Sequence, residues 1–174
     1  HLQRRRQRQM CIRDRGGTEE DFAKLMNVYA ERLGMTNTNF VNSSGWPDDN
    51  HYSTVKDIAI LSNAIIRDFP NLYTYFKMEE FTYNDITQPN RNKLLYQVQG
   101  ADGLKTGFTK ESGWGIAATA LRNDRRITVV INGTNSTRSR LNESSNLINW
   151  AFNQTSQQTL VEKDQFIKEV DVWL

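Results

Sequence analysis

Three strand-like runs follow one another closely in the second half of the 174-residue chain, at 104–108, 114–121 and 126–131. The segments between them, 110–113 (KESG) and 123–124 (ND), have the composition of hairpin turns. The middle run, WGIAATAL, is apolar on both faces, so we expect an interior strand that is covered on both sides. The pattern therefore predicts consecutive antiparallel strands with the middle run at the centre.

Helices are predicted before these strands. Thr18 can cap a helix, Gly34 supplies a left-handed stop, and apolar residues recur between them at helical spacing: Phe22, Leu25, Met26, Tyr29 and Leu33. A second helix starts at Ser53 or Thr54 and ends at Pro70. One side of this second helix is apolar, formed by Ile58, Leu61, Ile65 and Phe69.

The segment between the second helix and the three strands is less regular. A short helical piece through Tyr73 and Phe76 precedes a strand at 80–83 and a turn at 84–85. We interpret 86–96 (ITQPNRNKLLY) as a loop.

An amphipathic helix is predicted after the three strands, at 142–152, with Leu147, Ile148 and Trp150 pointing inward. From 155 the composition turns polar, and 166–174 (FIKEVDVWL) then alternates as a strand does. We interpret this end as a linker that leads into a second, β-type domain.

The first residues differ from the rest in charge. Residues 1–15 hold six Arg and one Asp, and they lack apolar periodicity. A basic arm that binds nucleic acid is one interpretation. No aromatic residue accompanies the charge, so we favour a disordered or foreign extension.

Several classes of site are excluded by composition. The single Cys excludes an internal disulfide and a Cys-rich zinc site. Only His1 and His51 are available, so we do not expect Ser-His-Asp, Cys-His or multi-histidine metal chemistry. We therefore expect no metal and no cofactor. No apolar run approaches the ~18 residues that a membrane span requires. The chain begins with His and shows no signal peptide, so we expect it to be a piece of a longer protein.

The tripeptide Lys105-Thr106-Gly107 is the strongest candidate for chemistry. In a serine acyl-transferase that recognises a peptide carboxylate, Lys supplies a fixed positive charge, Thr a hydroxyl donor, and Gly the space for a peptide at the strand edge. The backbone N–H of Phe108 can serve as an oxyanion donor. A solvated Lys at a strand end is the alternative. Side chains alternate along a strand, so Lys105 and Thr106 reach one cleft only if the strand presents its edge there.

The wider sequence resembles a known family. LGMTNTNFVNSSGWPDDNHYSTVKDIAIL, FTYNDITQPNRNKLL and GADGLKTGFT, together with the closing helix, resemble D-alanyl-D-alanine carboxypeptidases of the penicillin-binding-protein 5/6 type. The resemblance implies an α+β fold, namely an incomplete β-lactamase/transpeptidase-like fold with an antiparallel sheet flanked by helices. It assigns 17–153 to the C-terminal part of the carboxypeptidase domain and 154–174 to a linker and the first strand of a truncated β domain. Residues 1–16 are left as a basic tail.

The resemblance also implies an activity. Such enzymes remove the terminal D-alanine of peptidoglycan pentapeptides through an acyl-serine, and penicillins acylate the same serine. The implied partners are a stem peptide ending in D-Ala-D-Ala and β-lactams, with no nucleic acid. The implied location of the full-length protein is periplasmic, peripheral to the inner membrane through a C-terminal anchor that this chain lacks.

The family's site residues carry over in part. Its Lys-Thr-Gly element maps onto Lys105, Thr106 and Gly107, and Arg140 matches the arginine that the family places near the substrate carboxylate. The nucleophile and its Lys base (S-x-x-K), followed by S-x-N, should lie upstream of Gly17. We therefore expect no catalytic residue in this chain, no activity from it alone, and poor independent folding.

Two short matches are rejected on order. Ser53 to Lys56 fits S-x-x-K and Ser144 to Asn146 fits S-x-N. The family order is S-x-x-K, S-x-N and then K-T-G, whereas here K-T-G falls between the other two. We interpret Ser53 as a helix-capping residue and Ser144 as a first-turn helix residue. His51 is assigned to loop structure.

Three other functions remain open. The chain can be a non-catalytic module that binds peptidoglycan stem peptides reversibly, or a nucleic-acid-binding protein that relies on the six arginines. Within the enzyme class, a β-lactamase or D,D-endopeptidase of the same superfamily is the nearest rival.

Overall fold

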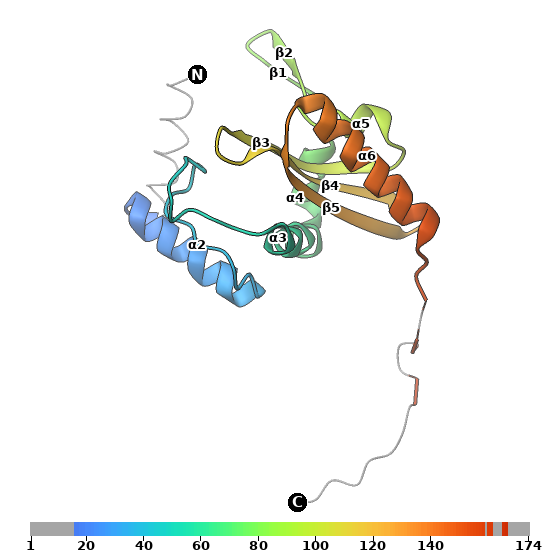
Figure 1. Ribbon diagram of the computed structural model, residues 1–174, viewed down its shortest axis with the longest axis horizontal. Helices are drawn as coiled ribbons and strands as arrows, with labels where there is room; N and C mark the ends of the chain where they lie inside the picture. Colours follow the sequence, from blue (N-terminus) through green and yellow to red (C-terminus); the bar gives the residue numbers. More distant parts are fainter. Residues whose placement is uncertain (1–15, 159, 162–164, 167–174) are drawn as a thin grey trace, which may run out of the picture.

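A three-stranded antiparallel sheet forms the centre of the computed structural model, which describes residues 16–158, 160–161 and 165–166 (Figure 1). Its strands are β3 (Ala101–Thr109), β4 (Gly113–Arg122) and β5 (Arg125–Thr134), in the order β3-β4-β5. β4 is the middle strand, as its apolar pattern predicts. Asn123 and Asp124 have φ values of 48° and 59°, which is the geometry of a two-residue hairpin turn.

Helices cover both faces of this sheet. On one face lies α6 (Thr137–Gln154), and a buried core forms between this helix, the short α5 (Leu94–Gln97) and the sheet: Leu94, Val98, Ile116, Ala118, Ala120, Val129 and Ile148. On the other face lie α3 (Val55–Asp68) and α4 (Pro70–Tyr73). The expectation that the middle strand is covered on both sides is confirmed.

The first two helices begin as predicted. In α2 (Glu19–Leu33) the N-cap is Thr18, and Gly34 ends the helix with φ 80°. In α3 the N-cap is Thr54, whose side chain accepts from the N–H of Asp57. The interpretation of Ser53 as the capping residue is therefore wrong by one position, because the Thr54 hydroxyl occupies the capping geometry.

The segment 86–96 is more regular than expected. β1 (Glu80–Tyr83) and β2 (Ile86–Pro89) form an antiparallel hairpin, which projects from the body in Figure 1. The predicted turn at 84–85 has φ values of 49° and 57°, so it directs the chain back along β1 and makes part of the expected loop a strand. The predicted short helical piece is present as α4 and the 3₁₀ helix η1 (Thr74–Lys77).

The last helix differs from the prediction at its start and on its buried face. Helix α6 begins at Thr137, after the N-cap Ser136, so Ser144 lies well inside the helix and not in its first turn. Ile148 is fully buried as expected, but Leu147 is 42% and Trp150 58% exposed. The buried stripe runs at intervals of four residues through Arg140, Ser144 and Ile148, which turns position 150 away from the sheet.

The apolar sides of α2 and α3 are only partly covered. A cavity of about 280 Å³ opens beside α2, and its lining is almost wholly apolar: Phe22, Leu25, Met26, Tyr29, Ala30, Leu33, Met35, Phe40 and Leu61. Leu25 and Tyr29 remain exposed. In the described part of the chain, no helix is long and apolar enough to cross a membrane. The expected basic tail at 1–16 and strand at 166–174 lie largely outside the described residues.

Candidate substrate groove

A groove of about 940 Å³ lies between the sheet, helix α3 and the loop that precedes this helix. Lys105, Thr106 and Gly107 line it from β3. The facing side consists of loop residues and the apolar side of α3: Trp46, Pro47, Asp48, His51, Ser53, Ile58, Leu61 and Ile65. Most of the predicted apolar side of α3 is thus directed at the groove, but Phe69, which follows the helix, is exposed and does not line it.

Strand β3 presents its edge to this groove. It is the outer strand of the sheet, and among the described residues β4 is the only strand that pairs with it. Lys105 lies opposite Ala117 and Thr106 opposite Ile116, so the two side chains start from opposite faces, yet both line the groove. Lys105 and Thr106 therefore reach one cleft from an outer strand, as the sequence analysis required.

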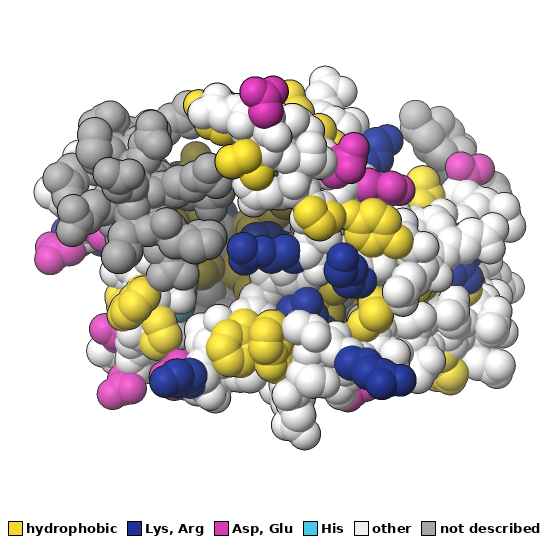
Figure 2. All heavy atoms as spheres, turned by 90° about the horizontal axis from the view of Figure 1, so that it is seen from above, with side chains coloured by type: hydrophobic (Ala, Val, Ile, Leu, Met, Phe, Trp, Pro, Cys, Tyr) yellow, Lys and Arg dark blue, Asp and Glu magenta, His cyan; other side chains and the backbone are white. Residues whose placement is uncertain are grey.

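The Lys105–Gly107 element combines a cation with open space. Lys105 Nζ donates to the carbonyl oxygen of Thr106 at 2.6 Å. A Cβ atom added at Gly107 would meet nothing within 4 Å, so the space beside this residue is open to a ligand. Basic side chains, with hydrophobic ones around them, gather at the centre of the face shown in Figure 2.

Phe108 continues β3 beyond this element. The residue is 52% exposed, and its ring packs on Trp114 with ring centroids 4.2 Å apart. Phe108 is not among the residues that line the groove, so the oxyanion role of its backbone N–H stays a prediction.

Arg140 approaches β3 from the opposite side of the sheet, on α6. Its Nη1 donates to the carbonyl oxygens of Gly107 and Gly115, each at 3.5 Å, and its guanidinium lies 5.6 Å from the Trp114 ring centre. Burial lowers the pKa of Arg140. Arg140 therefore contacts the Lys105–Gly107 element without lining the groove.

The rejected motifs have structural partners. Ser53 shares a hydrogen bond with Thr38 at 2.8 Å, and Ser144 donates to the Arg140 carbonyl oxygen at 2.6 Å inside α6. His51 lines the groove, and its Nδ1 accepts from the Val41 N–H at 3.3 Å, which suits a loop role. Burial lowers the pKa of His51, against the opposing effect of Asp48.

Two features of the site were not predicted. Glu111, Ser112 and Asn132 add polar groups to the groove lining. An ion pair between Asp102 and Arg126 lies just upstream of Lys105. The only sequence signal for this pair was Arg126, a charged residue in the strand-like run 126–131. Within the described ranges, no three His, Cys, Asp or Glu side chains are placed to hold a metal ion.

Comparison with known sequences identifies related proteins. Residues 13–135 match the family described as D-alanyl-D-alanine carboxypeptidase, peptidase S11. The D-alanyl-D-alanine carboxypeptidase DacC of Escherichia coli K12 is 40% identical over 158 residues, which cover 90% of this chain and 40% of the relative. DacA of the same strain is 39% identical over 137 residues, which cover 78% of this chain and 34% of the relative.

Solved structures agree. Penicillin binding protein 5 from Haemophilus influenzae superposes with a TM-score of 0.78 at 36% identity, over 82% of this chain and 42% of that one. Penicillin binding protein 6B from Escherichia coli superposes with a TM-score of 0.79 at 33% identity, over 86% of this chain and 48% of that one. The chain thus spans less than half the length of these relatives, and it has the helix-flanked antiparallel fold that they share. It belongs to the D-alanyl-D-alanine carboxypeptidase family.

Proposed function

We propose that this chain is part of a serine-type D-Ala-D-Ala carboxypeptidase that trims peptidoglycan pentapeptides through an acyl-serine. In this proposal the chain supplies the wall of the groove that binds the peptide's C-terminal end. The nucleophilic Ser and its Lys base come from residues outside these 174. The observation that carries the proposal is the position of Lys105-Thr106-Gly107 on the outer edge of β3, beside a groove of about 940 Å³.

The edge of β3 suits an extended peptide. A peptide that adds to a strand edge gains backbone hydrogen bonds along its length, and specificity comes from the side chains that meet it. The open space at Gly107 lets the peptide backbone approach closely. The C-terminal carboxylate of the peptide then lies near the hydroxyl of Thr106 and the charge of Lys105.

The remaining roles follow from the chemistry of acyl transfer. Attack on the scissile carbonyl creates an oxyanion, which the N–H of Phe108 stabilises together with a second donor. Lys105 stabilises negative charge near the nucleophile. Arg140 does not line the groove, so it adds positive charge behind the strand and does not hold the carboxylate itself.

Uncovered apolar surface supports the idea that further polypeptide completes the domain. An amphipathic helix is stable in water when its apolar side is packed against other residues. Here the apolar side of α2 lines an open cavity, and that of α3 lines the groove. The S-x-x-K match at Ser53 to Lys56 precedes K-T-G, but no S-x-N follows it before Lys105, and Ser53 shares a hydrogen bond with Thr38. The proposal therefore assigns the nucleophile to residues outside this chain.

The proposal extends to ligands and location. Penicillin-Binding Protein D2 from Listeria monocytogenes has been solved in a cefotaxime-bound form. It is 34% identical to this chain, with a TM-score of 0.71, and the match covers 76% of this chain and 55% of that one. We infer that β-lactams are ligands of the complete protein here too. The substrate lies in the cell wall, so the enzyme acts outside the cytoplasm, in the periplasm.

The alternative is a module that binds stem peptides without catalysis. It is favoured because K-T-G is not preceded by S-x-x-K and S-x-N in the family's order: no S-x-N stands before Lys105. The coding sequence upstream of Gly17 separates the two. In-frame codons for S-x-x-K and then S-x-N support the enzyme and mark residues 1–15 as foreign, whereas their absence supports the module.

A labelling experiment tests the missing nucleophile. The purified chain is incubated with a fluorescent penicillin and then denatured by heat. We expect no covalent label. A heat-stable label that disappears in Ser53→Ala would show that this chain carries its own nucleophile and would contradict the proposal.

A further inference from the structure

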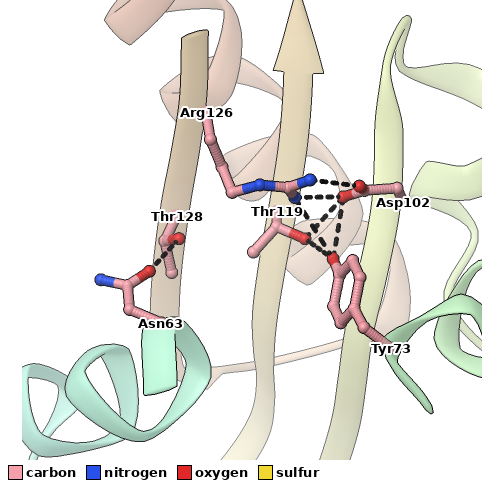
Figure 3. A network of polar contacts seen from close by, with 6 residues as sticks. All are labelled: Asn63, Tyr73, Asp102, Thr119, Arg126 and Thr128. Carbon is pink, nitrogen blue, oxygen red and sulfur yellow. Dashed lines mark hydrogen bonds and ion pairs between the residues drawn. The ribbon is translucent and has the colours of Figure 1, made fainter. Parts of the chain in front are cut away.

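A network of polar side chains joins the start of β3 to three other elements (Figure 3). Arg126 of β5 donates from Nη1 to Oδ1 and from Nη2 to Oδ2 of Asp102, each at 2.8 Å. The Thr119 hydroxyl of β4 donates to Asp102 Oδ1 at 2.8 Å, and the Tyr73 hydroxyl of α4 donates to the same atom at 2.9 Å. One carboxylate therefore ties β3 to β4, β5 and α4.

The two charged groups are largely shielded from water. The side chains of Asp102 and Arg126 are 19% and 25% exposed. Burial raises the pKa of Asp102, but hydrogen bonds from Arg126, Thr119 and Tyr73 outweigh it and leave this pKa below its ordinary value. The carboxylate is ionised at neutral pH, and a two-point pair of this kind fixes geometry as well as charge.

Asp102 is also the point where β3 and β4 change register. Ala101 pairs with Ala120 and Gly103 pairs with Thr119, so Asp102 is an extra residue between two successive pairs. Such a bulge shifts every residue beyond it relative to the partner strand.

The extra residue could be accommodated elsewhere. At the far end of the two strands Thr109 pairs with Gly113, next to the turn. With Ala101 paired at the near end, β3 has one residue more than the stretch of β4 that it pairs with, wherever the bulge lies. The two ends of the pairing therefore do not determine where along β3 the bulge lies.

The position of the bulge decides on which face of the sheet the Lys105 side chain lies. In the observed register Lys105 lies opposite Ala117, which lines the groove. If Asp102 joined the pairing and the bulge moved beyond Lys105, Lys105 would lie opposite Ile116, which belongs to the buried core and also lines the groove. Lys105 would then start from the face that Thr106 occupies in the observed register. Side chains alternate between faces, so this one-residue shift moves Lys105 to the opposite face.

We propose that Asp102 is a positioning residue whose carboxylate network holds the bulge upstream of Lys105 and so keeps the Lys105–Gly107 element in the register that serves the groove. The use of this element rests on the proposed function, but the register does not. Gly103 assists, because a Cβ at this position would lie 2.5 Å from the Tyr73 hydroxyl oxygen and would disturb the network.

Disulfide trapping measures the register directly. In a Cys11→Ser background, which removes the single native Cys, two reporters are made: Lys105→Cys with Ala117→Cys, and Lys105→Cys with Ile116→Cys. The first pair reports the observed register and the second the shifted one. With Asp102 intact, we expect the first pair to form its disulfide faster. Asp102→Ala should lower the ratio of the two rates by about tenfold or more.

Two further variants separate positioning from general stability. Arg126→Lys keeps a cation beside Asp102 but cannot make the two-point pair, so its ratio should lie between those of the unchanged protein and Asp102→Ala. Arg122→Ala removes a cation of β4 that donates to Gln99 and Asn149, each at 2.9 Å, away from Asp102. It should lower the free energy of unfolding without changing the ratio.

The outcomes are decisive in either direction. A ratio that stays at its starting value in Asp102→Ala, with stability lowered as in Arg122→Ala, overturns the proposal. If Asp102→Ala does not fold, Asp102→Asn replaces it, because the amide keeps an acceptor oxygen while removing the charge, and an unchanged ratio again overturns the proposal. No ligand enters the measurement, so its result is independent of whether the groove binds a peptide.

Discussion

Arg140 reaches from α6 to the carbonyl oxygen of Gly107, with its Nη1 3.5 Å from that oxygen, and so joins the helix to the last residue of the Lys105–Gly107 element. The residue is 7% exposed, and within the described part of the chain no carboxylate lies at ion-pair distance from it. A buried cation without a counter-ion costs free energy.

This relationship predicts an unusual mutational result. Arg140→Met keeps an extended apolar stem and removes the buried charge, so we expect the free energy of unfolding to stay within about 1 kcal/mol of the original value or to rise. Urea unfolding measures it. A loss of about 3 kcal/mol or more would show instead that the arginine has a mainly structural role.

The two glycines that flank Lys105 should respond differently to the same change. Gly107→Ala adds a methyl group to open space, so stability should be unchanged while binding of a peptide ending in D-Ala-D-Ala weakens. Thermal unfolding and peptide titration are the measurements. Equal peptide binding by this variant and the unchanged chain would remove Gly107 from the site.

Gly103→Ala is the matched control. Its methyl group would lie 2.5 Å from the Tyr73 hydroxyl oxygen and 3.1 Å from Thr119 Oγ1. We expect a loss of about 1–3 kcal/mol of unfolding free energy, measured by urea unfolding. Unchanged stability would show that the network tolerates displacement.

Acid should weaken the fold through Asp102. Its pKa in the folded protein lies below the ordinary value of 3.8, so the stability it contributes is present above that value and is lost as the pH falls through the folded value. Asp102→Asn should be less stable than the unchanged protein at neutral pH, but it should lose less stability as the pH falls below 3.8. Unfolding free energies measured from neutral to acid pH give the comparison, and parallel curves for the two proteins would contradict the assignment.

Alkali should act through Tyr73. Burial, aided by the nearby charge of Asp102, raises the pKa of Tyr73 from 10.0 to about 12. The resulting stability is complete below pH 10 and is lost as the pH rises through about 12, because the unfolded phenol ionises first. Tyr73→Phe should lose less stability over this interval, as measured by urea unfolding at successive pH values. An identical pH dependence in both proteins would argue against a buried phenol.

Local signals in the sequence were enough to predict much of the fold. Thr18 and Thr54 with their capping partners marked the starts of α2 and α3, and Asn123-Asp124 marked the hairpin between β4 and β5. These features depend on residues a few positions apart, so they can be read without tertiary structure. The K-T-G element was likewise found in the sequence, and the structure places it on an outer strand beside a groove.

Features that depend on distant residues could not be predicted in this way. The start of α6 lies in a polar stretch whose periodicity is masked because its inward positions are Arg140 and Ser144. The inward direction of Trp150 was predicted wrongly because hydrophobicity alone does not give the phase of this helix. The Asp102–Arg126 pair joins residues 24 positions apart across an intervening strand, and no local pattern announces it.

The most direct test of the groove is a titration of the isotope-labelled chain with a short peptide ending in D-Ala-D-Ala, followed by amide NMR shifts. The account predicts shifts concentrated at Lys105 to Phe108, and much smaller shifts with the same peptide ending in L-Ala-L-Ala. Equal responses to the two peptides, or shifts confined to other parts of a folded chain, would contradict it.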